Sequence, residues 1–263
     1  MAEPQKAMKA LGLIPARYQS TRLPGKPLAS IGGLPMVVRV YRRVQPVFAE
    51  LYVVTDSEII AQACLEHGCA CLVSQRAHES GTSRCAEALE ILRAQGQERN
   101  SWEVVVNVQG DEPFIDPEPL RRLVMAFESP EVSIATLVRP FRAGEEVANP
   151  NRPKVALSST GEALYFSRAV IPYYRNVAPN NEPAYWAHIG VYAYRPAVLA
   201  RIAQLPPAPL EQAESLEQLR WLNAGLRIQT VAVEQEGLSV DTPEDLALAQ
   251  HLAAREENSH TSC

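Results

Sequence analysis

The chain has 263 residues, 46% of them hydrophobic, so it can bury a full core and lies near the upper size of a single α/β domain. Its formal net charge of −5 excludes the global basic field that gathers nucleic acid or anionic lipid. We therefore expect any anionic ligand to be held by local cations.

Apolar segments of strand length alternate with segments of helical periodicity in the first half of the chain. The expected strands are Ala10–Pro15, Leu51–Thr55, Ala70–Ser74, Val104–Val108 and Val132–Val138. Apolar residues recur between them at the i, i+3, i+4, i+7 spacing of a buried helix face: Val37, Val40, Tyr41 and Val44; Cys85, Ala88, Leu89 and Leu92; and Leu120, Leu123, Val124 and Phe127. This alternation predicts an α/β fold with a mainly parallel central sheet and helices on both faces.

The pattern changes after Asn149. Lys154–Leu157 and Ala163–Ser167, joined by Ser158–Gly161, predict a β-hairpin, and Pro172–Pro183 predicts an exposed loop. We interpret residues of about 150–190 as an excursion from the sheet.

The last part of the chain is expected to return to the sheet. Ile189–Tyr194 and Leu226–Glu234 have the composition of strands, and a helix is expected over Glu211–Leu222. A closing helix should begin at Thr242, whose hydroxyl can cap it. Residues 10–254 are thus expected to form one domain, between an N-terminal extension (1–9) and a frayed tail (255–263).

The remaining composition is typical of a soluble, cytoplasmic protein. There are five cysteines with neither paired metal-ligand spacings nor a redox Cys-x-x-Cys motif, so we expect reduced thiols at Cys64, Cys69, Cys71, Cys85 and Cys263. The N-terminus lacks the apolar segment of a secretion signal, and no run reaches the roughly 18 apolar residues of a membrane span.

A short cationic segment, IPARYQSTRLPGKPL (Ile14–Leu28), follows the first expected strand directly. Ligands of doubly wound sheets bind at the carboxyl ends of the strands, so Arg17, Arg22 and Lys26 are well placed to bind a triphosphate. Prolines on both sides of Gly25-Lys26 stiffen the loop, which weakens the alternative that its cations only aid solubility. The dinucleotide fingerprint and the P-loop are both absent from the sequence.

Two acids follow other expected strands. In VVVNVQGDEPFIDP, Asp111 comes directly after an apolar run, and a carboxylate there suits Mg²⁺, which needs only one or two of them beside phosphate oxygens. Alternatively, an acid in this turn could cap the helix that begins near Asp116. We favour this interpretation for Glu112 but not for Asp111. In SVDTPEDL, Asp241 alone would be a neighbour of a helix cap, but paired with Asp111 it becomes a second candidate metal ligand.

Seven blocks of the sequence together resemble the 3-deoxy-manno-octulosonate cytidylyltransferase (CMP-KDO synthetase) family. They occur in family order from about Leu11 to His251: Ile14–Leu28, Gly81–Arg84 within HESGTSR, Asn107–Pro113, ALYFSRAVIPY, HIGVYAYR, LEQLR and VDTPEDL. The resemblance implies a nucleotide-diphospho-sugar transferase-like fold, a homodimer, Mg²⁺ as cofactor, and CTP and a 2-keto-3-deoxy sugar acid as substrates, for lipopolysaccharide or related glycan synthesis.

The resemblance also implies roles for individual residues. The triphosphate and ribose would be bound by Pro15, Ala16, Arg17, Ser20, Arg22 and Lys26. The cytidine side would be bordered by Thr82 and Arg84, and the nucleotide and metal by Gln109, Asp111 and Asp241. The catalytic residues would be Lys26, Arg22, Asp111 and Asp241.

The sugar acid would be bound by Arg168, His188, Tyr192, Glu217 and Gln218. From the residues alone, a surface arginine is the commoner interpretation of Arg168, and a packed or solvated histidine that of His188. Glu217 and Gln218 would be ordinary exposed helix positions. Two other functions stay open: a cytidylyltransferase for sialic acid or 8-amino-octulosonate, and a non-catalytic nucleotide-binding protein.

Overall fold

The computed structural model describes residues 8–19, 22–96, 102–176 and 184–261, with side chains described as far as Glu256. The chain folds into two compact units. Unit 1 comprises Met1–Arg121 and Gly237–Cys263, and unit 2 comprises Arg122–Glu236.

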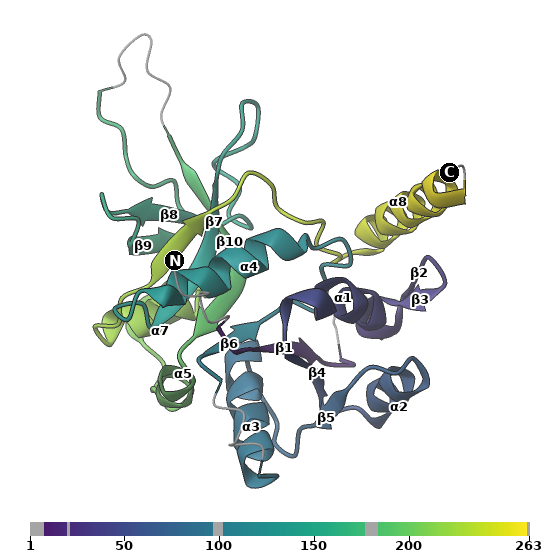
Figure 1. Ribbon diagram of the computed structural model, residues 1–263. Coiled ribbons are helices and arrows are strands. Elements are labelled where there is room, and N and C mark those ends of the chain that lie inside the picture. The colour runs from purple at the N-terminus through teal and green to yellow at the C-terminus, as the bar shows by residue number, and fades with distance from the viewer. Residues whose placement is uncertain (1–7, 20–21, 97–101, 177–183, 262–263) are drawn as a thin grey trace, which may run out of the picture. The chain divides into compact units, whose positions relative to one another are not determined.

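Unit 1 contains a parallel sheet of strands in the order β6 (Val104–Asn107), β1 (Ala10–Ala16), β4 (Glu50–Thr55) and β5 (Cys71–Val73). Crossover helices connect them: α1 (Met36–Val44), α2 (Glu58–Glu66) and α3 (Gly81–Ala94). Figure 1 shows α1 and α3 on opposite faces of β1. Because both faces are covered, the adjacent residues Leu13 and Ile14 of β1, which point to opposite faces, are both completely buried.

The chain order of these strands reverses between β1 and β6. The chain runs outward from β1 to β4 and β5, then returns through α3 to place β6 on the other side of β1. In doubly wound sheets the crevice for a ligand lies at such a reversal, outside the carboxyl ends of the strands. The segments that follow β1 and β6 are therefore the ones expected to line a site.

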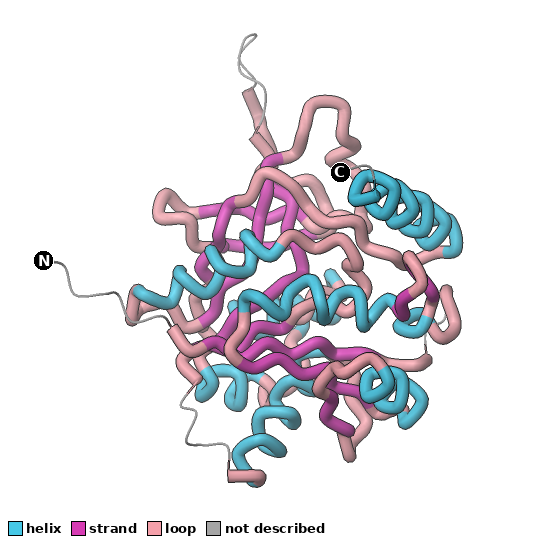
Figure 2. The backbone as a smooth tube through the Cα atoms, turned by 45° about the vertical axis from the view of Figure 1, so that its right-hand side comes forward, coloured by secondary structure: helices cyan, strands magenta, loops and turns pink. Residues whose placement is uncertain are grey.

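Helix α8 (Pro243–Thr261) closes unit 1 and is the helix next to the C-terminal label in Figure 2. Its capping agrees with the expectation, because the Thr242 hydroxyl accepts from the Asp245 backbone N–H at 3.2 Å. Ala249 and Ala253 pack against Ile31 and Met36. Helix α8 continues to Thr261, so residues 255–261 of the tail that we expected to be frayed are helical, and residues 262–263 lie outside the described residues.

Other elements of the chain were not anticipated or have different bounds. A small hairpin of β2 (Ser30–Ile31) and β3 (Leu34–Pro35) precedes α1, and 3₁₀ turns occur at η1 (Lys26–Leu28), η2 (Gln45–Val47) and η4 (Ala126–Glu128). Helix α4 (Pro117–Met125) begins after Asp116, whose carboxylate accepts from the Glu118 backbone N–H at 3.0 Å. Asp116 therefore caps this helix, and the prediction that favoured Glu112 for this role was wrong.

Unit 2 is built on β11 (Gln229–Ala232), β7 (Ile134–Pro140) and β10 (Trp186–Tyr194), with β7 parallel to β11 and antiparallel to β10. The predicted hairpin is confirmed as β8 (Lys154–Leu157) and β9 (Ala163–Ser167), with β8 also paired to β10. The register between β10 and β7 shifts between Ile189 and Tyr192, as at a β-bulge. Residues 172–176 of the predicted exposed loop have no regular structure, and 177–183 lie outside the described residues.

One helix prediction in unit 2 was wrong. Instead of a single helix over Glu211–Leu222 there are two short ones, α6 (Pro209–Glu214) and α7 (Gln218–Asn223), after α5 (Pro196–Ile202). The break occurs at Ser215, which adopts the left-handed conformation with φ of 51°. Serine carries no strong sequence signal for that conformation. The helical periodicity therefore predicted one continuous helix across the break.

The α/β class predicted from the sequence, with a mostly parallel sheet and covering helices, is confirmed. Cys64, Cys69, Cys71 and Cys85 are free thiols, and Cys263 lies outside the described residues. Among the described residues, every helix is too short or too polar to cross a bilayer.

Candidate functional site

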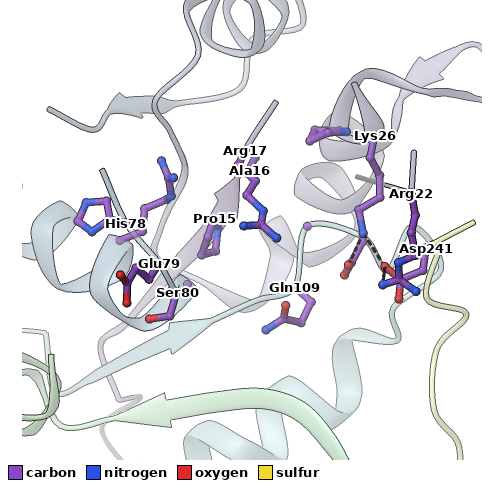
Figure 3. A pocket seen from close by; sticks show the side chains of 15 residues that line it. Pro15, Ala16, Arg17, Arg22, Lys26, His78, Glu79, Ser80, Gln109 and Asp241 are labelled. Atoms are coloured by element: carbon purple, nitrogen blue, oxygen red, sulfur yellow. Dashed lines mark hydrogen bonds and ion pairs between the residues drawn. The ribbon is translucent and has the colours of Figure 1, made fainter. Parts of the chain in front are cut away.

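The carboxyl ends of β1 and β6 border a cavity of about 480 Å³ in unit 1 (Figure 3), a volume in the range of small-molecule sites. Four segments line it. They contribute Pro15, Ala16 and Arg17 after β1, with Arg22, Lys26 and Pro27 from the cationic loop; His78–Gly81 and Arg84 around the start of α3; Gln109, Gly110 and Asp111 after β6; and Asp241 before α8.

Lys26 is the centre of the ionic end of this cavity. Its Nζ atom lies 2.7 Å from Oδ2 of Asp111 and 3.0 Å from Oδ1 of Asp241 (Figure 3). The Arg22 Nη2 atom lies 3.2 Å from the same Asp241 oxygen, but this guanidinium is largely exposed. One loop cation and two acids that are 85 and 215 residues away in sequence thus converge on one point.

Backbone geometry explains this convergence. Gly25 has a φ of 67°, a conformation that glycine adopts without strain, and its N–H donates to the Tyr18 carbonyl at 3.3 Å. The turn starts η1 and directs Lys26 into the cavity. On the opposite side, the Val240 N–H donates to the Asp111 carbonyl at 2.9 Å, which brings Asp241 next to Asp111.

The electrostatics keep Lys26 charged. Burial of the side chain acts to lower its pKa, but the adjacent carboxylates of Asp111 and Asp241 outweigh that effect, and the pKa is raised above its ordinary value. A cation held between two acids is an arrangement that can bind and release a polyanion, because each partner can exchange its contact for one with the ligand.

The start of α3 forms the opposite end of the cavity. Ser80 is the N-cap of this helix, since its Oγ accepts from the Ser83 N–H at 3.2 Å. Arg84, only 4% exposed, donates from Nη2 to Asp56 at 2.8 Å. At the floor, Gly110 leaves room for the backbone of β1, because a Cβ there would lie 3.0 Å from the Pro15 carbonyl oxygen.

The structure brings together most of the residues that the resemblance assigned to the nucleotide. Of these, Thr82 is buried in the first turn of α3 and does not line the cavity, and Ser20 lies outside the described residues. Sequence reasoning had not selected His78, Glu79, Ser80, Gly81, Gly110 and Pro27. The signal for four of these was present in HESGTSR, where a serine precedes the first turn of a helix.

The residues assigned to the sugar lie in unit 2. His188 and Tyr192 both belong to β10, with ring centroids 5.4 Å apart, and Trp221 of α7 meets Tyr192 edge-on at 4.9 Å. Thr136 donates its hydroxyl hydrogen to the Val191 carbonyl at 2.8 Å, so it accepts from His188 Nε2 at 3.1 Å. Burial lowers the pKa of His188 to about 3, which leaves a neutral imidazole with its proton on Nε2.

Glu217 and Gln218 lie at the start of α7. Gln218 is buried, and the structure gives its Nε2 no hydrogen-bond partner among the described residues. Glu217 acts electrostatically on Tyr192, adding to the effect of burial in raising the pKa of that phenol. Arg168 instead donates to the backbone carbonyls of Pro150, Glu214 and Ser215, so its guanidinium supports the segment ahead of α7.

The two carboxylates near Lys26 are the candidate metal ligands. No cluster of three or more His, Cys, Asp or Glu side chains suited to a metal occurs in the described part of the chain. Two carboxylates fit a hard cation that takes its other ligands from phosphate oxygens and water, and they already converge on a cationic atom. The donor set therefore fits a cation that binds together with a phosphate ligand.

Comparison with known proteins identifies the class. Residues 11–228 match the model of a family described as "Cytidylyltransferase". The chain belongs to this cytidylyltransferase family and is a nucleotidyltransferase enzyme.

Two relatives and one solved structure show which enzymes of this family the chain resembles. The chain is 45% identical over 251 residues to a protein from Parabacteroides distasonis, with 92% of this chain and 97% of the relative covered, and 45% identical over 253 residues to one from Polynucleobacter necessarius, with 95% and 98% covered. Both are named 3-deoxy-manno-octulosonate cytidylyltransferase, which confirms the resemblance seen in the motifs. A CMP:2-keto-3-deoxy-manno-octonic acid synthetase solved with CTP superimposes with a TM-score of 0.85 at 42% identity, covering 94% of this chain and 99% of that one.

Proposed function

We propose that the chain transfers CMP from CTP to 3-deoxy-manno-octulosonate in a Mg²⁺-dependent reaction that releases pyrophosphate. One observation carries the proposal: Lys26 Nζ lies within hydrogen-bond distance of both Asp111 and Asp241 in a cavity at the strand reversal. The names of the relatives, and the CTP bound in the similar structure, support the choice of nucleotide and sugar. From the composition of the sequence, we also propose that the enzyme is cytoplasmic.

In this proposal the ionic end of the cavity binds the triphosphate. Lys26 and Arg22 would exchange contacts with Asp111 and Asp241 for contacts with phosphate oxygens, and Arg17 lines the cavity close to them (Figure 3). Gln109 and Arg84 line the same cavity on the side proposed for the nucleoside. Ser20 and Thr82 are proposed on the resemblance alone.

Asp111 and Asp241 would hold the divalent cation. Such a cation, when bound, would neutralise charge on the phosphates and lower the pKa of a hydroxyl that approaches it. The protein's own contribution at this end is to fix the two carboxylates at one point, with Val240 N–H bonded to the Asp111 carbonyl as the link between their segments.

The sugar-binding residues are proposed in unit 2. The buried Gln218 amide, left without a partner in the described residues, and the neutral His188 are groups that suit sugar hydroxyls. Tyr192 and Glu217 are in electrostatic contact with one another and complete this set. A role for Arg168 toward the sugar carboxylate rests on the resemblance, since its donors are already used by backbone carbonyls.

The proposed reaction forms a bond between the anomeric oxygen and the α-phosphorus, while the bond from that phosphorus to the α,β-bridging oxygen breaks. The proton of the anomeric hydroxyl is released to water. Negative charge then accumulates on the departing pyrophosphate. Lys26 and Arg22 supply positive charge at the ionic end of the cavity, where this charge develops. Catalysis on this account is mostly positioning and electrostatic stabilisation.

We propose a homodimer on the strength of the resemblance. Phe166 is completely buried and meets His188 edge-on inside unit 2, so it is not available as a subunit contact. Exposed apolar side chains on and after β9, at Leu164, Val170 and Tyr173, are better candidates. Sedimentation velocity at two concentrations tests this, and a monomer at both would count against it.

A pyrophosphate-release assay tests the function. CTP, Mg²⁺ and 3-deoxy-manno-octulosonate should give one pyrophosphate per CMP-sugar formed, and sialic acid or 8-amino-octulosonate in parallel reactions would reveal a different acceptor. CTP binding without turnover on any acceptor would favour the non-catalytic alternative.

A further inference from the structure

Three of the five cysteines, Cys64, Cys69 and Cys71, gather around the turn that follows α2. The Cys69 N–H donates to the Cys64 carbonyl at 2.8 Å and the Gly68 N–H donates to the Leu65 carbonyl at 3.0 Å, while Gly68 adopts the left-handed conformation with φ of 69°. These features define a Schellman turn, which reverses the chain and brings Cys69 next to Cys64. Cys71 then begins β5, the strand that packs against α2 (Figure 1). The fold therefore places three thiols in one small region.

The thiols of Cys64 and Cys71 are hydrogen-bonded to each other. This bond raises the pKa of Cys64 and lowers the pKa of Cys71, so Cys64 is the donor and Cys71 the acceptor. Burial adds to the rise at Cys64, which is completely buried, whereas Cys71 is only half-buried. Cys71 therefore combines access to solvent with a stabilised thiolate, which are the two properties of a reactive cysteine.

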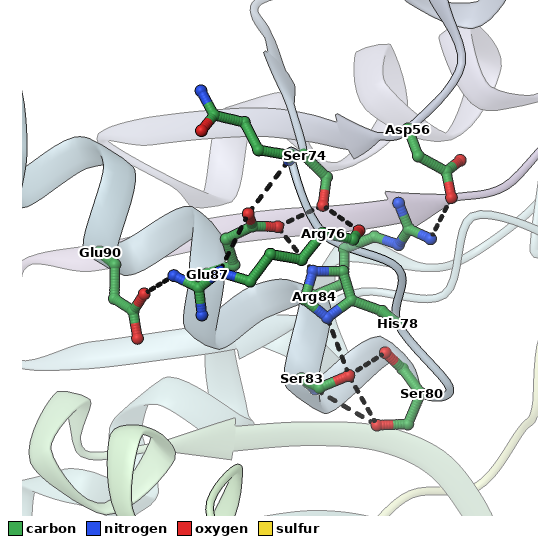
Figure 4. Close-up of polar contacts among 10 residues, drawn as sticks. Asp56, Ser74, Arg76, His78, Ser80, Ser83, Arg84, Glu87 and Glu90 are labelled. Carbon is green, nitrogen blue, oxygen red and sulfur yellow. Dashed lines mark hydrogen bonds and ion pairs between the residues drawn. The ribbon is translucent and has the colours of Figure 1, made fainter.

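The strand that carries Cys71 is fixed on both sides. Strand β5 pairs with β4 along its whole length. Immediately after it, Glu87 of α3 accepts hydrogen bonds from Ser74 Oγ, from the Gln75 N–H at 3.0 Å and from His78 Nε2 at 2.6 Å (Figure 4). The thiols of α2 and β5 are thus held in contact by the fold, so the entropy of bringing them together has already been lost and a bond between them is favoured.

Cys69 is the less suitable partner for Cys71. The two residues flank Ala70, whose carbonyl continues the sheet by accepting from the Val53 N–H at 2.9 Å. In extended backbone, residues two apart have Cα atoms roughly 6.6 Å apart and side chains that point the same way. A disulfide needs Cβ atoms about 3.5–4.5 Å apart, so Cys64, on the facing helix, is the better partner.

We propose that Cys64 and Cys71 are a modification site, a dithiol that forms a reversible disulfide by exchange with a low-molecular-weight disulfide, RSSR. The Cys71 thiolate attacks one sulfur of RSSR and displaces RS⁻, and the Cys64 sulfur then attacks the mixed disulfide at Cys71 and displaces the second RS⁻. The protons of the two protein thiols pass to the two leaving thiolates. One RSSR is thus reduced to two RSH while the dithiol is oxidised. Neither cysteine lines the cavity, so the inference is independent of the proposed function.

The test treats the folded, full-length protein with oxidised glutathione, alkylates the remaining thiols in denaturant and maps the peptides by mass spectrometry. A glutamyl protease that cleaves after Glu66 places Cys64 and Cys71 on different peptides, and fragmentation distinguishes Cys71 from Cys69. Cys64 and Cys71 should lose their alkylation together and appear in one cross-linked species, and dithiothreitol should restore both thiols.

Serine variants separate the two roles. Cys71→Ser should slow modification of the remaining two thiols of the cluster by about 10-fold or more, because both are buried and the stabilised thiolate is gone. Cys64→Ser should stop at a mixed disulfide of Cys71 with glutathione, since no second thiol resolves it. Cys69→Ser is the matched control, which keeps both partners and should form the link at the rate of the unaltered protein.

Three results would overturn the inference. They are a disulfide that joins Cys69 to either neighbour, a mixed disulfide that persists on Cys71 of the unaltered protein, and full alkylation of all three cysteines, which would mean that the thiols serve only in packing. If a serine variant does not fold, the bond mapped in the unaltered protein decides alone.

Discussion

Two ionisable groups, one partly buried in unit 1 and one buried in unit 2, show pKa shifts in opposite directions. Lys26 in unit 1 is 16% exposed at its side chain, and its pKa is raised. His188 in unit 2 is also buried, and its pKa is lowered to about 3. Burial disfavours the charged form in both cases, so the difference comes from the partners.

The partners also indicate what each region can bind. Lys26 meets two carboxylates, which keep it charged and ready to exchange with an anionic ligand. His188 meets the neutral hydroxyl of Thr136 and the rings of Phe166 and Tyr192, which exclude charge. Desolvation acts in the same direction on both groups, but their neighbours differ. The result is a charged region around Lys26 that suits a polyphosphate and a neutral region around His188 that suits hydroxyl groups.

The largest effect is expected from removing one carboxylate beside Lys26. Asp111→Asn or Asp241→Asn should reduce turnover by about 100-fold or more, because one preorganised charge at the reacting phosphates is lost. Steady-state pyrophosphate release at saturating Mg²⁺ measures this. Asp116→Asn is the matched control, since Asp116 caps α4 and does not line the cavity. Near-normal turnover in both test variants would remove the proposed metal site.

The ionic region could be predicted from the sequence because its parts lie beside elements with clear apolar patterns. Arg22 and Lys26 belong to the loop after the first expected strand, Asp111 follows Val104–Val108, and Asp241 directly precedes the expected closing helix. The pairing itself, across 85 and 215 residues, required the resemblance and then the coordinates.

Other parts could not be predicted, for physical reasons. Glu87 occupies a helix position whose burial depends on three donors from a loop, and no local pattern encodes that set. The helix break at Ser215 depends on a left-handed residue that is not glycine. In both places, contacts in three dimensions decide the structure, whereas propensity and periodicity describe only neighbours in sequence.

A smaller effect is expected from neutralising Lys26. Lys26→Met should weaken apparent CTP affinity by about 10-fold or more, because a charge-assisted contact to phosphate is lost and two carboxylates are left facing the ligand. Lys9→Met is the matched control, with the same chemical change at an exposed position outside the cavity. Calorimetric titration with CTP measures the difference, and equal affinities for the two variants would give the cationic loop some other role.

The smallest effect concerns His188 and appears as a pH dependence of stability. Its pKa is about 3 in the folded chain and near the ordinary histidine value of about 6.5 once unfolded. Between those values the unfolded chain binds a proton that the folded chain does not, so acidification favours unfolding. The contribution is about 1.4 kcal/mol for each pH unit below about 6.

His188→Gln removes the titrating group, and its amide can still donate a hydrogen bond to Thr136. The variant therefore separates the contribution of His188 to the pH dependence of stability from that of the carboxylates, whose protonation in acid also destabilises the fold. Urea unfolding at pH 7, 6 and 5 should therefore show a shallower decline for this variant than for the unaltered chain. His251→Gln, on an exposed position of α8, is the matched control. Parallel declines for His188→Gln and the unaltered chain would mean that the imidazole in unit 2 gains a proton in the folded state, and the contrast with Lys26 would then fail.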